Sequence, residues 1–72
     1  MPGVEARTGR VEAYDAHRGW GTIVADGDGE HLGFHCTQIA DGTRTISPGT
    51  RVHYRRVPAH LGTYEAADVT PT

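Results

Sequence analysis

Short runs of β-branched, aromatic and aliphatic residues alternate with polar turn residues along this chain. Ten glycines and four prolines interrupt it so often that no window of about 10–12 residues carries the apolar stripe of an amphipathic helix. Five runs are typical of strands instead, approximately Ala6 to Tyr14, Trp20 to Ala25, Leu32 to Cys36, Thr50 to Val57 and Thr63 to Thr70. The pattern therefore predicts an all-β protein.

The connections between these runs contain residues typical of turns. They span 15–19, the acidic Asp-Gly-Asp-Gly-Glu segment at 26–30, then 40–43, 47–49 and 58–62. Strands with turns roughly every 8–12 residues indicate a small closed barrel, because closure removes the edges that so short a sheet could not protect. We expect a single domain over residues 1–72, with a core from about 6 to 70.

Alternation along two of the strands assigns side chains to opposite faces of the sheet. Ile23, Leu32 and Phe34 share the face that suits a hydrophobic core. Trp20 and His35 then lie on the outer face, where large rings do not contribute to packing of the core. This pair is the first candidate for a binding surface.

Length and composition narrow the classes of function. A chain of 72 residues has little core to share with a deep pocket. Its longest apolar run is only three residues, Ile23 to Ala25, and no apolar leader is evident, so we expect neither a membrane span nor secretion. A single cysteine, Cys36, suits a reducing compartment, and we expect a cytoplasmic protein.

Charge argues against binding to nucleic acid by electrostatics alone. Nine acids against seven bases give a formal net charge of −2, and there is no basic tail. The second half is the more basic, with Arg44, Arg51, Arg55 and Arg56. Arg55 and Arg56 are adjacent in a strand and so point to opposite faces; we expect both to be solvated.

No metal, cofactor or catalytic site is expected. His31 and His35 lie about 13 Å apart along one strand, which is too far to chelate one ion. Alternation directs His35 and Cys36 to opposite faces, and Cys36 has no recognisable nucleophile turn or orienting acid. The acidic segment at 26–30 lacks the spacing of a calcium loop and is read as a solvated turn. We expect neither an enzyme nor a small-molecule substrate.

Four segments, in order, carry a resemblance to a known family. They are Arg-Gly-Trp-Gly-Thr-Ile at 18–23, Leu-Gly-Phe-His-Cys at 32–36, and the stretches 46–52 and 65–69. The first two resemble the K-G-F-G-F-I and V-F-V-H-F motifs of bacterial cold-shock domains, and the others resemble that family's L-x-x-G-x-x-V and A-A-x-V segments. The resemblance covers about Thr8 to Val69. It implies a five-stranded antiparallel Greek-key barrel of the oligonucleotide-binding (OB) type.

The resemblance also implies a function, which is binding of single-stranded RNA or DNA. Exposed aromatic rings on a rigid sheet stack on bases. The resemblance implies that Trp20 and His35 stack on bases and that Tyr14 stacks at the margin of the site. Arg18 occupies the usual lysine position and is expected to contact a phosphate or a base. Members of the family typically act as cytoplasmic RNA chaperones or as regulators of transcription or translation.

Several positions that are usually exposed aromatics in the family are not aromatic in this chain. They hold Ala13, Thr22, Gly33, Cys36 and Thr43. Tyr64 is an additional aromatic in the last strand, either for packing or for one restored contact. We expect weak binding over two or three nucleotides. The alternative is a cold-shock fold turned into a protein–protein interaction module, which the negative charge and the lost rings favour.

Overall fold

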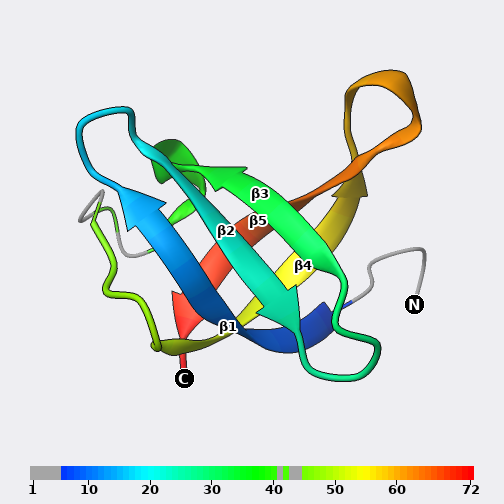
Figure 1. Cartoon of the computed structure of the whole chain (residues 1–72), viewed down its shortest axis with the longest axis horizontal. Coiled ribbons are helices and arrows are strands. Elements are labelled where there is room, and N and C mark those ends of the chain that lie inside the picture. Colours follow the sequence, from blue (N-terminus) through cyan, green and yellow to red (C-terminus); the bar gives the residue numbers. More distant parts are fainter. Residues whose placement is uncertain (1–5, 41, 43–44) are drawn as a thin grey trace.

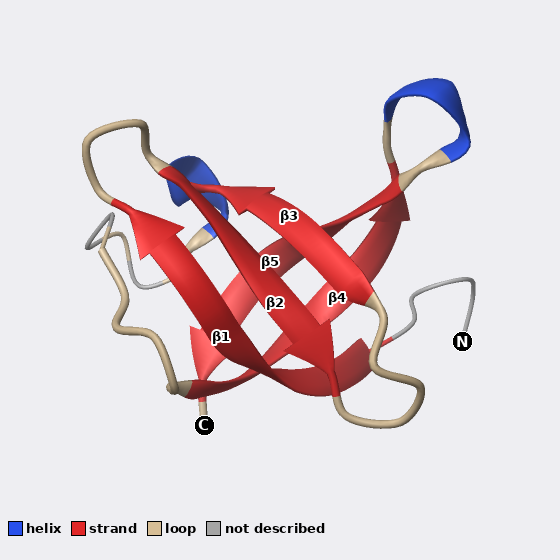
Figure 2. Ribbon diagram, viewed as in Figure 1, coloured by secondary structure: helices blue, strands red, loops and turns tan. Residues whose placement is uncertain are grey.

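The computed structural model describes residues 6–40, 42 and 45–72, and in it five strands close into a barrel (Figure 1). The strands are β1 (Ala6–Asp15), β2 (Trp20–Ala25), β3 (His31–His35), β4 (Arg51–Pro58) and β5 (Tyr64–Pro71). Two short 3₁₀ turns, η1 (Cys36–Gln38) and η2 (His60–Gly62), follow β3 and β4 (Figure 2). Within these described ranges no helix has the length and apolarity needed to cross a bilayer.

The order of strands around the barrel is β1-β2-β3-β5-β4. Four neighbouring pairs are antiparallel, and β3 pairs with β5 in parallel, where Gly33 lies opposite Glu65. An odd number of strands cannot alternate in direction all the way round a closed barrel, so one pair must be parallel. The predicted five-stranded OB-type barrel is confirmed, with this one parallel pairing.

Each predicted strand differs from the observed one by no more than one residue at either end, and one of these differences matters for the site. Cys36 does not continue β3 but begins η1. Strand alternation therefore stops at His35. The expectation that His35 and Cys36 point to opposite faces was wrong, since the Cys36 Sγ lies 3.9 Å from the His35 Nδ1.

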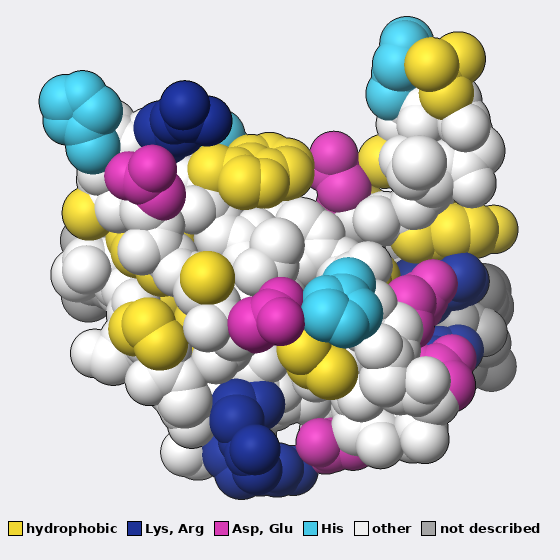
Figure 3. Space-filling model, in the orientation of Figure 1, with side chains coloured by type: hydrophobic (Ala, Val, Ile, Leu, Met, Phe, Trp, Pro, Cys, Tyr) yellow, Lys and Arg dark blue, Asp and Glu magenta, His cyan; other side chains and the backbone are white. Residues whose placement is uncertain are grey.

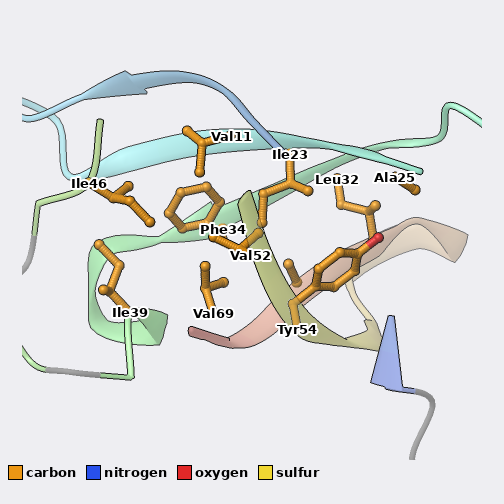
Figure 4. Packing of buried hydrophobic residues seen from close by; sticks show 11 residues of the cluster. Val11, Ile23, Ala25, Leu32, Phe34, Ile39, Ile46, Val52, Tyr54 and Val69 are labelled. Atoms are coloured by element: carbon orange, nitrogen blue, oxygen red, sulfur yellow. The ribbon is translucent and has the colours of Figure 1, made fainter. Parts of the chain in front are cut away.

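The core lies between the front strands β1–β2–β3 and the strands β4 and β5 behind them (Figure 1). Ile23, Leu32 and Phe34 are at most 1% exposed, so the predicted inward face of β2 and β3 is confirmed. Val52, Tyr54 and Val69 pack against them from the other side of the barrel, as Figure 4 shows.

A β-bulge in β1 decides which side chains reach the outer face. The pairing of β1 with β2 shifts register between Val11 and Ala13. Glu12 and Ala13 are consequently both exposed, and Tyr14 turns half-buried toward the core.

Candidate nucleic-acid interface

Trp20 lies flat on the outer face of the sheet. A Cβ atom placed on Gly33 would come within 2.4 Å of Trp20 Cζ2, so the indole rests directly over the backbone of β3. The residue is still 40% exposed. A large ring supported from below and open to solvent is suited to stacking on a base.

His35 lies beside Trp20 on the neighbouring strand, at the end of β3. The two residues are paired across β2 and β3, and their ring centroids are 6.4 Å apart with the planes inclined by 58°. The His35 Nδ1 accepts a hydrogen bond from the backbone N–H of Thr37, at 3.3 Å. Since that N–H can only donate, the proton of the neutral ring is on Nε2. The Nε2–H group of His35 therefore remains available as a hydrogen-bond donor to a ligand.

Arg18 lies in the tight turn between β1 and β2. The Asp15 Oδ1 accepts the backbone N–H groups of His17 and Arg18, at 3.0 and 3.2 Å, and Gly19 closes the turn with a φ of +66°. The Arg18 side chain is 80% exposed, and its Nε lies 3.8 Å from the Asp15 Oδ2. So exposed an ion pair is weak, and the guanidinium is able to turn toward a phosphate.

Tyr14, which was expected to stack on a base at the margin of the site, packs inward against the core. Its ring stacks on Phe34, with centroids 6.0 Å apart and planes inclined by 16°. Gly21 makes room for this pair, since a Cβ there would lie 2.5 Å from Phe34 Cζ and 2.8 Å from Tyr14 Cδ1. Burial, followed by the influence of Cys36, raises the pKa of the Tyr14 hydroxyl. The bulge in β1 is the reason for the difference.

A shallow hollow nevertheless joins three of the four predicted site residues. Its volume is about 270 Å³, and its lining consists of Ala13, Tyr14, Asp15, Arg18, Trp20, Gly21 and Thr22. His35 lies on the opposite side of Trp20. The structure therefore brings Trp20, His35 and Arg18 together, with Tyr14 at the rim.

Three of the five positions that lack the family's aromatic rings lie around the Trp20 indole. Ala13 and Thr22 line the hollow, and Gly33 lies beneath Trp20. Cys36 is half-buried in η1. Thr43 lies outside the described residues.

Sequence reasoning did not single out Glu12, which lies on the outer face near Trp20. Its Oε1 is 3.2 Å from the His31 Nδ1 and accepts the Thr22 hydroxyl at 3.3 Å. The signal was present, because Glu12 follows the inward-facing Val11 and so points outward. A carboxylate on this face repels phosphate and accepts hydrogen bonds.

Arg55 and Arg56, which were expected to be solvated, are held by carboxylates, and so is Arg51. Arg51 pairs with Asp26 at 2.7 Å, Arg55 with Asp68, and Arg56 with Glu30. The contact of Arg56 with Glu30 is bidentate, at 2.8 and 2.9 Å, and it holds the pKa of the Glu30 carboxyl below its usual value.

These pairs leave no continuous basic area among the described residues of the face seen in Figure 3, where acidic, basic and apolar side chains are interspersed. The Arg56 guanidinium also lies 3.5 Å from the centroid of the Tyr64 ring, so one face of that ring is covered. No group of three or more His, Cys, Asp or Glu side chains in the described ranges is placed to hold a metal ion.

Comparison with known proteins agrees with this geometry. The model of the "'Cold-shock' DNA-binding domain" family matches residues 7–72. Among the curated proteins, none matches the chain. The match spans nearly the whole sequence, from the second residue of β1 to the end of the chain, and includes β2 to β5 in full. The chain therefore belongs to the cold-shock DNA-binding domain family, whose members generally bind single-stranded nucleic acids.

Proposed function

We propose that this protein binds single-stranded RNA or DNA by stacking bases on Trp20 and His35, with Arg18 contacting a phosphate or a base. The observation that carries the proposal is the indole of Trp20, which lies on Gly33 and is 40% exposed. Tyr14 supports the site from the rim of the hollow. The protein would serve in the cytoplasm as an RNA chaperone or as a regulator of transcription or translation.

The size of the stacking surface limits the strength of binding. Each stacked base contributes about 1–3 kcal/mol to the free energy of binding, and this contribution is largely independent of the base sequence. Among the residues that the structure describes, only Trp20 and His35 offer exposed rings next to each other. The site accordingly fits two or three nucleotides, with weak affinity.

Fluorescence titration tests this function directly, because Trp20 is the only tryptophan in the chain. A single-stranded heptamer of alternating cytosine and thymine, added at low salt, is expected to quench its emission. A duplex of the same length is the control, and it should have little effect because its bases are already stacked. Unchanged emission at high micromolar heptamer would contradict the proposal.

A second candidate function is binding to a protein partner. Three observations favour it: Arg51, Arg55 and Arg56 are already ion-paired, a carboxylate lies on the sheet face, and Leu61 is 87% exposed. Leu61 is part of η2, in the loop that projects between β4 and β5 (Figure 1). Failure of all oligonucleotides to quench Trp20 would favour this candidate over the first.

A further inference from the structure

Glu12 presents one anchored and one open oxygen on the outer face. Within the described residues, its two side-chain contacts, from the Thr22 hydroxyl at 3.3 Å and the His31 ring at 3.2 Å, are both to Oε1. Within the described part of the chain, Oε2 has no hydrogen-bond partner. A carboxylate held through one oxygen is a preorganised acceptor at the other.

The carboxylate is within reach of a base that stacks on Trp20. Thr22, which holds Glu12, is two residues from Trp20 on the same strand, and side chains on one face of a strand are about 7 Å apart at this spacing. Thr22 is also paired with Gly33, over which the indole lies. The edge of a base on Trp20 can therefore point along β2 toward Glu12.

An ionised carboxylate can only accept hydrogen bonds, so it discriminates among bases by their donors. Cytosine N4, adenine N6 and guanine N2 are amino groups that donate to a carboxylate. Thymine and uracil have no amino group, and their one ring N–H is flanked by two carbonyl oxygens that would face the negative charge. A charge-assisted hydrogen bond between the carboxylate and the amino group of cytosine, adenine or guanine is favourable. The carbonyl oxygens of thymine and uracil are instead repelled by the carboxylate.

We propose that Glu12 is a specificity-determining residue that selects bases with an exocyclic amino group over thymine and uracil. The inference rests on the proposed function, because it requires a base stacked on Trp20. Glu12 reads the edge of that base through Oε2, while Thr22 and His31 hold the carboxylate in place through Oε1. The same charge keeps the phosphate backbone away from this part of the face.

The test compares heptamers of deoxycytidine, deoxyadenosine and thymidine by quenching of Trp20. The wild-type protein is expected to bind the cytosine and adenine heptamers at least about fivefold more tightly than the thymine heptamer. Glu12→Gln replaces the carboxylate with an amide that both donates and accepts. This variant should bind thymine more tightly than wild type does and bring the ratio to within about twofold.

Asp28→Asn is the matched control, since it removes one negative charge from the turn between β2 and β3 and keeps the side-chain oxygen that accepts the Glu30 N–H. It should retain the wild-type preference. Equal binding of all three heptamers by wild type, or the same ratio in Glu12→Gln, would overturn the role of Glu12 and leave stacking intact. Absence of quenching by every heptamer would instead refute the nucleic-acid function itself.

Discussion

At the scale of single residues, Gly33 is more than a lost aromatic position. The indole of Trp20 occupies the space into which any side chain at Gly33 would project. One ring therefore covers two positions of the sheet face, because the residue beneath it has no Cβ. Neither motif alone indicates this contact, since Trp20 belongs to the segment 18–23 and Gly33 to the segment 32–36.

Gly33→Ala is therefore expected to displace the indole and weaken binding. The added Cβ would lie 2.4 Å from Trp20 Cζ2, so the ring must lift from the sheet. We expect a changed emission maximum and at least about a fivefold loss in affinity, corresponding to the lower end of one stacking contribution.

Gly27→Ala is the control for this substitution, because a Cβ there meets no atom within 4 Å. It should leave both emission and affinity near wild type. Gly33→Ala with wild-type emission and affinity would mean that the position of the ring over Gly33 is not needed for binding.

At the scale of strands, alternation with a period of two predicted which side chains of β2 and β3 face the core. It did not predict the side-chain orientation at the end of β1. Ile23 and Phe34 are buried and Trp20 is exposed, as expected. In β1 the bulge adds one residue between the paired positions, which turns Tyr14 from the outer face to the inner one. No residue type in Val11 to Ala13 marks a bulge, so the sequence alone does not reveal it.

The end of β3 was missed for a related reason. The His35 ring accepts a hydrogen bond from the backbone N–H of Thr37, and η1 begins at Cys36. The strand therefore ends at His35, one residue earlier than the strand pattern indicates. The contact is between a side chain and the backbone two residues ahead, which the hydrophobic pattern does not report. The barrel itself was predictable because it depends on apolar alternation and turn residues, which are local.

The assignment of faces leads to a test with three variants. Phe34→Ala leaves a cavity in the core and is expected to cost about 3–5 kcal/mol in the free energy of unfolding, enough to unfold a domain of this size. Trp20→Ala and His35→Ala should cost much less stability and weaken binding by about 1–3 kcal/mol each.

Thermal melts measure the first effect, and the anisotropy of a labelled heptamer measures the second, since Trp20→Ala removes the intrinsic fluorophore. The contrast depends on the opposite orientation of Phe34 and His35, one residue apart in β3. A folded Phe34→Ala together with a strongly destabilised Trp20→Ala would mean that the two faces are exchanged.

At the scale of the whole molecule, the distribution of ion pairs decides how charge enters binding. The acidic turn between β2 and β3 supplies Asp26 and Glu30 to Arg51 and Arg56, both from β4. These contacts tie the front sheet to the back of the barrel. They also reduce the number of arginines available to phosphate. Among the described residues, Arg18 and Arg10 are exposed on the side of β1 and β2.

A shallow salt dependence follows from this arrangement. Two or three phosphate contacts, at a coefficient near −0.7 per contact for single strands, give a slope of about −1.4 to −2.1 for log K against log salt. Titrations of the cytosine and thymine heptamer between low and moderate salt measure this slope, and Arg18→Gln should make it shallower by about 0.7. A slope steeper than about −4 in wild type would require the paired arginines to leave their carboxylates for phosphate. That result would move the binding surface from the Trp20 face to the sides of the barrel where those pairs lie.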